Sequence, residues 1–569
     1  MAHNKNSFNR NRVAVLAVSL LLVCSISLLS GCDLLFGDAQ SPLGETTEVA
    51  SMPTAQATEP LSGTTAMASS IPGESGFPAT QTTAIVSNPE DSSDPILSKA
   101  PLPAGLDMTT DRQAALDYLD GLVTTDFGGL SVMITTTDIS VINPDPTQST
   151  DENAGATVIN TDDLARVWRN QAVAAKYNVS LSYNYITPDQ LLTAAQKAYH
   201  SLDYFGDFIV ATTYQISQLA YSGLLFNLNK VPFLDTTAPY YNQNLIAGFN
   251  NSGVQYAVSG DALFEPDSLW GMFYNSSLIQ KYNLTDPIDL VRSGAWDVDT
   301  MAAMARKATG DLNGDGMLTN DADRFGLGVG GTVLNYVDVF FQTGGCHLLS
   351  NNSAGTTVLT ATNSYNMNVL DKIRLMYTSD NKYNLVSPLM GMGASYTPDV
   401  AASAFAGGRL LFYVAPLSQI QQLNTPGLNW NVVPVPKMTT SQPDYVTPVT
   451  SGVYAVCAPR QDQNTELTGK LVQAFFAASY KHIVDEYLTR MQLFYLQNAA
   501  SVQMMSQIIG NAYGDLGYMF SITSSTIVND ALQPIYSYAL SGTDITPTDQ
   551  AKYQKDVATF LANMFSVGQ

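Results

Sequence analysis

The chain has few of the residues that usually carry catalysis. Its 569 residues include only four histidines, four cysteines and four tryptophans. The histidines are His3, His200, His347 and His482, and none stands at a metal-ligand spacing from another. Cys346 and His347 are neighbours, so in a strand they would point to opposite faces and could not act as nucleophile and base. The sequence contains no Gly-x-Ser-x-Gly elbow, phosphate-binding loop or paired cysteine motif. We therefore expect a protein that is not an enzyme and needs no organic cofactor.

Positive charge is also scarce. The chain has 26 basic and 49 acidic residues, which gives a net charge of −23. Nucleic acids and anionic ligands both require concentrated Lys and Arg, so the composition disfavours them as partners. The balance suits a protein that works outside the cytoplasm with a neutral or cationic ligand.

The N-terminus carries the pattern of an export signal. Lys5, Arg10 and Arg12 precede an apolar stretch over residues 13–29, which ends in Leu29-Ser30-Gly31-Cys32. This pattern is typical of a bacterial lipoprotein signal, so residues 1–31 would be removed and Cys32 would carry the lipid. The alternative is an uncleaved anchor, but a retained helix needs about 20 apolar residues, and the chain turns polar soon after Cys32. Stable attachment to the cell membrane takes more than one acyl chain, such as palmitate.

Residues 32–100 are expected to form a disordered tether, because they are rich in Ser, Thr, Ala, Pro and Gly and poor in apolar surface. Residues 101–569 form the folded part, which is longer than one core usually supports, so two or more domains are expected. Cys346 and Cys457 fall in this part. They could form a disulfide or remain buried thiols, and the lack of a paired motif favours thiols.

The folded part begins with alternating strands and helices. Strand-like runs at 130–137, 180–186 and 207–213 alternate with helical patterns at 162–175 and at about 188–200. This alternation predicts βαβ units and a mostly parallel sheet. Ligands bind beyond the carboxyl ends of such strands, which places a candidate site near Thr137-Asp138 and Thr213-Tyr214. Trp168 lies on the apolar face of its helix and is expected in the core.

Several further segments occur in the order found in one family. They are 206–208 (GDF), 223–228 (GLLFNL), 270–275 (WGMFYN), 294–299 (GAWDVD), 311–316 (DLNGDG), 324–327 (RFGL), 405–409 (FAGGR), 433–437 (VPVPK) and 515–517 (DLG). Together they resemble the extracellular solute-binding proteins of ABC importers, family 1, the sugar-type group. The resemblance runs from about Leu130 to the end of the chain.

The resemblance implies an α/β fold of the two-lobed, type II periplasmic-binding-protein kind, with lobes joined by crossing hinge strands. The first lobe would comprise about 126–235 plus 385–440, and the second lobe mostly the remainder. Hinge closure over a solute would let the closed form dock on an ABC permease. We expect a monomer, lipid-anchored on the extracytoplasmic side of the cell membrane, that carries a sugar or oligosaccharide. A surface-anchored hydrolase or lyase acting on polysaccharide, and a binding protein that serves a sensor kinase, are the alternatives.

Sugar sites combine aromatic faces with hydroxyl, amide and carboxylate groups. The candidate ligand-binding residues are Tyr214, Asp261, Trp270, Asn275, Phe405 and Arg409. Aromatic residues in α/β proteins are more often core than ligand shelf, and Trp296 is interpreted as packing. For Phe405 and Arg409 the alternative is a strand entry with an ordinary surface arginine.

The segment Asp311-x-Asn313-x-Asp315-Gly316 resembles the first half of an EF-hand-type calcium loop. Its candidate ligands for a structural Ca²⁺ are Asp311, Asn313, Asp315, Met317, Thr319 and Asp323. Position twelve is Ala322, so a terminal acid would have to come from Asp321 or Asp323. The alternative is an Asx-rich turn between a helix that ends near Lys307 and a strand at Phe325.

Overall fold

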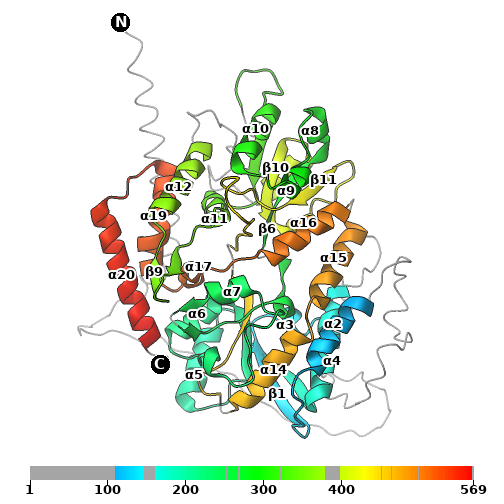
Figure 1. Ribbon diagram of the computed structural model, residues 1–569, viewed down its shortest axis with the longest axis vertical. Helices are drawn as coiled ribbons and strands as arrows, with labels where there is room; N and C mark the ends of the chain where they lie inside the picture. The colour runs from blue at the N-terminus through cyan, green and yellow to red at the C-terminus, as the bar shows by residue number, and fades with distance from the viewer. Residues whose placement is uncertain are drawn as a thin grey trace, which may run out of the picture. The chain divides into compact units, whose positions relative to one another are not determined.

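The computed structural model describes residues 109–145, 161–251, 253–266, 269–318, 322–377, 398–449, 452–462, 464–496 and 499–566. The chain divides into two units, Met1–Pro89 and Glu90–Gln569, and every described residue belongs to the second. The expected signal, the lipidated Cys32 and the tether lie outside the described residues. Figure 1 shows the described elements.

Four strands form the first sheet, in the order β12-β3-β1-β2. They are β1 (Leu130–Thr136), β2 (Val179–Tyr185), β3 (Phe208–Thr212) and β12 (Tyr454–Cys457). β1 pairs in parallel with β2 and β3, whereas β12 lies antiparallel to β3. The predicted strands and the mostly parallel sheet are thereby confirmed.

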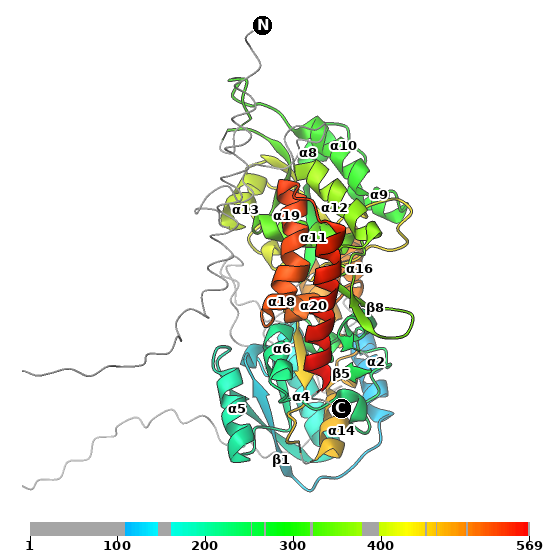
Figure 2. The same cartoon turned by 90° about the vertical axis from the view of Figure 1, so that its left-hand side faces the viewer.

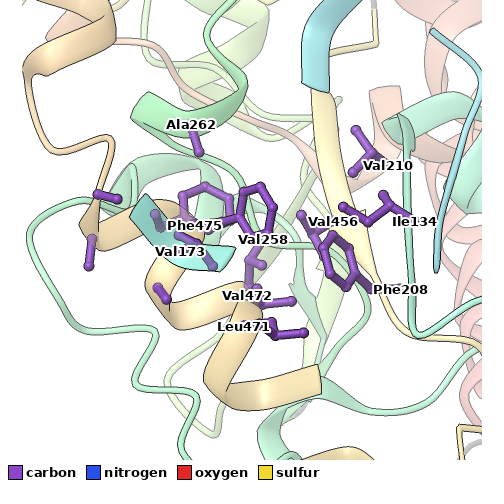
Figure 3. Close-up of a cluster of buried hydrophobic side chains, with 14 of the residues drawn as sticks. Ile134, Val173, Phe208, Val210, Val258, Ala262, Val456, Leu471, Val472 and Phe475 are labelled. Carbon is purple, nitrogen blue, oxygen red and sulfur yellow. The ribbon is translucent and has the colours of Figure 1, made fainter. Parts of the chain in front are cut away.

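Helices cover both faces of this first sheet. Successive residues of a strand point to opposite sides, so each buried strand presents apolar side chains to both layers. Phe208 and Val210 face a core built with α4 (Thr161–Tyr177) and α14 (Thr465–Ala477), as Figure 3 shows. Ile209 faces the other way, toward α5 (Leu191–Ser201) and α6 (Thr213–Tyr221). Burial of each large apolar side chain contributes about 1.5–3 kcal/mol, so these two helical layers stabilise the first sheet. We call this sheet with its helices the first lobe.

Two further helices complete the first lobe. α2 (Thr109–Asp120) packs against α14, and α15 (His482–Phe494) packs against α4. Trp168 on α4 is partly buried, packs against the core and meets the ring of His482 edge-on at 5.1 Å. Trp168 therefore packs at the margin of the core in which it was expected.

The second sheet has the order β11-β6-β10-β7. Its strands are β6 (Trp270–Asn275), β7 (Phe325–Val329), β10 (Leu410–Pro416) and β11 (Trp430–Val433). β6 is antiparallel to β10 and β11, and β10 is parallel to β7. Every residue of β6, β7 and β11 is buried, which explains their near-continuous apolar sequences.

The helices of the second sheet precede, separate or follow its strands, and together they make the second lobe. They are α8 (Ser276–Lys281), α9 (Pro287–Arg292), α10 (Val298–Ala308), α11 (Val333–Thr343), α12 (Ser364–Tyr377), α13 (Pro398–Ala406) and α16 (Ala499–Gly510). Gly326 lets β7 approach α10 closely, since a Cβ there would lie 2.3 Å from that of Ala305. Trp296 is fully buried and its indole N–H donates to the Pro434 carbonyl at 2.8 Å, which confirms its packing role.

The expected assignment of residues 385–440 to the first lobe is wrong for their described part. β10 and β11 hydrogen-bond to β6 and β7, so residues 398–440 belong to the second sheet. The chain returns to the first sheet only at β12. The strand pattern of 410–416 and 430–433 indicates buried strands, but it carries no information on which sheet they join.

The two lobes are joined by several passages of the chain. It leaves the first lobe between residues 256 and 270, returns between 434 and 454, and leaves again between α15 and α16. The C-terminal elements are α17 (Leu516–Phe520), α18 (Ser525–Ile527), the π-helical turn η6 (Val528–Leu532), α19 (Gln533–Ser541) and α20 (Pro547–Ser566). α19 packs on α11 and α12, and Figure 2 shows α19 and α20 lying side by side.

Short elements fill the connections. They are α3 (Ile139–Ile142), α7 (Gln243–Gly248), η2 (Leu228–Lys230), η3 (Asp261–Leu263), η5 (Leu417–Ile420), the ribbon of β4 (Asn250–Asn251) with β5 (Val254–Gln255), and the ribbon of β8 (Leu349–Asn351) with β9 (Thr357–Leu359).

Candidate functional site

Polar side chains gather where β1 and β3 end, at one edge of the first sheet. The Thr137 hydroxyl donates to Gln215 Oε1 at 3.0 Å, which links the loop after β1 to the start of α6. The Tyr454 hydroxyl, at the start of β12, donates to Asp138 Oδ2 at 3.1 Å. The loops that the sequence places at a candidate site therefore do lie together.

Helix capping fixes the side chains at this edge. Thr212 is the N-cap of α6 and accepts a hydrogen bond from the Gln215 N–H at 3.4 Å, while Gln215 accepts one from the Thr212 N–H at 3.0 Å. Asp138 caps α3 in the same way and accepts from the Ser140 N–H at 2.9 Å. The caps hold these oxygen atoms in fixed positions, as a binding site with directional hydrogen bonds requires.

A buried carboxylate of the second lobe lies close to this edge. Asp338 on α11 is 6% exposed, and its Oδ1 accepts hydrogen bonds from the Tyr518 and Tyr536 hydroxyls, both at 2.8 Å. Burial raises the pKa of Asp338 to about 7, although the two tyrosine hydrogen bonds act in the opposite direction. Near neutral pH this group therefore exists in both charge states.

Tyr214 connects the two sides. Burial raises its pKa, the charge of Asp338 adds to the rise, and a hydrogen bond with Ser521 lowers it. Tyr214 is the second residue of α6, so the charge of a second-lobe carboxylate acts on a first-lobe side chain. We call Tyr214, Asp338, Tyr518, Ser521 and Tyr536 the bridging cluster.

The rest of α6 extends the same contact. Ser217 and Thr523 share a hydrogen bond between their hydroxyls, and the ring of Tyr221 stacks on that of Phe560 with centroids 6.0 Å apart. α6 thus joins the edge of the first sheet to the C-terminal segment, which itself packs on the second lobe.

Other predicted ligand-binding residues have structural surroundings. Trp270 is 3% exposed inside β6, opposite Pro416 of β10. Phe405 is fully buried and packs against the Tyr413 ring at 5.6 Å. The structure places both in the second core, which favours the packing alternative for these two aromatic residues.

The remaining three candidates have contacts outside the bridging cluster. Asn275 ends β6 and caps α8 by accepting from the Leu278 N–H at 3.0 Å. Arg409 is half-buried, and its carbonyl accepts from the Phe325 N–H at 3.0 Å where β10 begins beside β7. Asp261 lines a cavity beside the segments that join the lobes, described below. Of the six candidates, Tyr214 alone belongs to the bridging cluster.

The predicted calcium loop is held by its own backbone. Asp311 accepts from the Gly314 and Gly316 N–H groups at 2.6 and 2.8 Å, which is the Asx-turn pattern of the alternative interpretation. Asp323 is fully buried and accepts from the Leu312 N–H at 2.8 Å.

Further hydrogen bonds form within the loop, and calcium ligation stays a prediction. Asp315 accepts from the Met317 N–H and from the Asn313 side chain, both at 2.8 Å, and Thr319 lies outside the described residues. Among the described residues no group of three or more His, Cys, Asp or Glu side chains is arranged to hold a metal ion. The carboxylate and amide oxygens nevertheless suit Ca²⁺.

The two described cysteines and the buried histidines are poorly suited to nucleophilic or acid-base catalysis. Cys346 and Cys457 are free and fully buried, which confirms the thiol interpretation, and burial raises the pKa of each. Burial also lowers the pKa of His347 to about 4 and that of His482 to about 3, so both are neutral at physiological pH. A neutral buried thiol is a weak nucleophile.

Residues 169–482, more than half of the chain, match the model of a family described as bacterial extracellular solute-binding protein. The chain belongs to this family. A solute-binding protein of this kind works outside the cytoplasm, and the two α/β lobes joined by crossing segments are its periplasmic-binding fold. No curated protein sequence matches the chain.

Solved structures of other solute-binding proteins are similar to this one at low sequence identity. The cyclic alpha-maltosyl-1,6-maltose binding protein from Arthrobacter globiformis is 14% identical with a TM-score of 0.48, over 77% of this chain and 100% of that one. The maltose/maltodextrin-binding domain from Bdellovibrio bacteriovorus, bound to maltotriose, is 13% identical with a TM-score of 0.41, over 76% and 100%.

Two features of this solute-binding protein were missed by sequence reasoning. Asp338, in the apolar helix sequence VLNYVDVFFQT, is the one charged residue of α11 and could have been noticed for that reason. Tyr518 and Tyr536 carry no such signal.

Within the described part of the chain, no helix combines the length and the apolar character needed to cross a bilayer.

Proposed function

We propose that this protein is a lipid-anchored extracytoplasmic receptor that binds a carbohydrate-like solute between its lobes and delivers it to an ABC permease. Family membership supports solute binding. The observation that carries the location of the site is the bridging cluster, in which the charge of Asp338 of the second lobe acts on Tyr214 of the first. A solute held there would contact both lobes at once.

The chemistry of the two edges supports a carbohydrate-like solute. Thr137, Gln215, Tyr454 and Tyr214 offer neutral hydroxyl and amide groups, and Asp138 offers carboxylate oxygens. Such groups pair with the many hydroxyls of a sugar, whose burial without partners would be costly. The net charge of −23 disfavours an anionic solute.

Hinge closure supplies the transport step. The passages at 256–270 and 434–454 let the lobes rotate as rigid bodies, and a solute that contacts both lobes stabilises the closed form. Its binding energy must be greater in that form than in the open one. Closure then distinguishes a loaded receptor from an empty one at the permease.

The lipid anchor and the permease are the finer parts of this proposal. The segment Leu29-Ser30-Gly31-Cys32 supports acylation at Cys32, and a tether of residues 32–100 raises the local concentration of the receptor at the membrane. Growth with a labelled palmitate tests this: label is expected in the wild-type chain and absent from Cys32→Ser. Label that persists in the variant would refute acylation at this residue. Recovery of permease subunits after mild cross-linking supports an importer, whereas recovery of a sensor kinase supports the alternative.

Calorimetric titration with a panel of sugars and oligosaccharides tests solute binding. We expect micromolar binding of at least one, without product release. Tyr214→Phe should weaken it about fivefold to tenfold, because one hydrogen bond contributes about 1 kcal/mol.

Tyr221→Phe is the matched control on the same helix, since Tyr221 is 54% exposed and stacks on Phe560. It should leave the affinity within about twofold of wild type, as most exposed sites do. Release of a cleaved product, or equal losses in the two variants, would overturn the proposed function or the proposed site.

A further inference from the structure

A cavity lies beside the segments that join the lobes. Its volume is about 320 Å³. The first lobe contributes residues 241–245 and Val484, and the second lobe contributes Ile509, Gly510 and Ala512 at the end of α16. Pro239 also lines it, and so do residues 259–261, 263–265, Leu269 and Val453 of the two connecting passages. We call this space the hinge cavity. No member of the bridging cluster is among its described lining residues.

The charged residues that line the hinge cavity are both acidic. Asp261 and Glu265 line it, and no Lys or Arg is found among its described lining residues. Glu265 Oε1 accepts from Arg166 at 3.1 Å, so a cation already balances its charge. Asp261 takes part in no salt bridge within the described part of the chain, and its Oδ2 accepts from the Lys481 backbone N–H at 2.6 Å.

The surroundings of Asp261 favour a positively charged neighbour. Burial raises its pKa to about 7. The hydrogen bond from the Lys481 backbone N–H lowers the pKa, the Asp485 charge raises it, and the Lys481 charge has the smallest effect, which lowers it. A carboxylate with this environment has lost hydration that no ion pair replaces. A cation in the cavity would supply the missing partner.

Apolar side chains form much of the remaining wall. Phe264, Leu269 and Ala512 are buried, Ile509 is partly buried, and all four line the same cavity. Asn242 and Asn244, at the start of α7, also line the cavity. The volume is at the lower end of that of ligand pockets, which suits a small occupant with one charged end and a short apolar part.

We propose that the hinge cavity binds a small organic ammonium ion, with Asp261 as its counter-ion and the side chains of Phe264 and Ile509 against its apolar part. The walls belong to both lobes and to two connecting passages, so they change their relative positions when the hinge bends. Binding here is therefore thermodynamically linked to lobe closure, and each ligand alters the affinity of the other by the same factor.

The test uses n-butylammonium as probe and n-butanol as its neutral counterpart, titrated into the full chain at constant ionic strength and followed by saturation-transfer NMR. A saturable signal is expected for n-butylammonium and none for n-butanol. Binding should strengthen about tenfold between pH 6 and pH 8, because Asp261 ionises over this range while the amine stays charged. Glu265, Arg166, Lys481 and Asp485 are the other charged groups that surround the carboxylate.

Two variants separate the cavity from nonspecific attraction. Asp261→Asn keeps the shape and removes the charge, and Gly510→Phe fills the space, since a Cβ at Gly510 meets no atom within 4 Å. Each should abolish the signal, and the exposed Asp120→Asn should not. Far-UV circular dichroism checks that each variant is folded. Absence of n-butylammonium binding to the wild type, equal binding of n-butanol, or undiminished binding in folded Asp261→Asn or Gly510→Phe would overturn the proposal.

Discussion

Replacement of Asp338 by Asn should make the stability of the protein less dependent on pH. The pKa of this carboxyl lies at about 7 in the folded chain and near its ordinary value of 3.8 in the unfolded chain. As pH rises between these values, the unfolded state loses its proton first, so the folded state is progressively disfavoured. The loss amounts to about 4 kcal/mol in total, of which about 3 kcal/mol falls between pH 5 and pH 8.

The amide introduced by Asp338→Asn would retain an oxygen to accept from Tyr518 and Tyr536, but it has no proton to lose. Urea unfolding of the wild type and Asp338→Asn at pH 5 and pH 8 measures the effect. The wild type should lose about 3 kcal/mol more than the variant over this interval. Asp261 and Asp515 have similarly raised pKa values and remain in both proteins, so the difference isolates Asp338. The exposed Asp120→Asn should follow the wild type. Equal pH dependence in wild type and Asp338→Asn would refute the reasoning.

Three further outcomes are expected. Peptides containing Cys346 and Cys457 should stay unlabelled by maleimide in the native protein and become labelled in concentrated guanidinium chloride, and native labelling would contradict their full burial. Gly248→Ala should destabilise the chain by about 3 kcal/mol in urea, because the new Cβ would lie 1.8 Å from the Gly514 carbonyl oxygen, while Gly510→Ala should change little. If the predicted loop binds Ca²⁺, chelation should lower the melting temperature of the wild type but not of Asp311→Ala, and an unchanged wild-type transition would count against the ion.

The first lobe could be predicted from sequence because its signals are local. β1, β2 and β3 are short apolar or β-rich runs, each followed by an amphipathic helix or a helix cap. The alternation fixes both the elements and the edge at which their carboxyl ends meet. Thr137, Asp138 and Tyr214 were placed together on this basis.

In the second lobe, strand pairing and long-range contacts could not be predicted from local sequence patterns. β10 pairs with β6 and β7, and which partners a strand finds depends on the whole chain rather than on its own sequence. Asp338 likewise meets Tyr518 and Tyr536 across separations of 180 and 198 residues. Trp270 and Phe405 share the composition of a ligand shelf and of a core, and only their burial distinguishes the two.

The late position of β12 in the chain has a consequence for the order in which the first lobe folds. Val210 of β3 pairs with Val456 of β12, and between them lies nearly all of the second lobe. The first sheet therefore lacks a strand, and its core lacks α14, until most of the chain has been synthesised. Long-range pairing of this kind slows folding. A nascent chain that cannot close its first core early stays extended for longer.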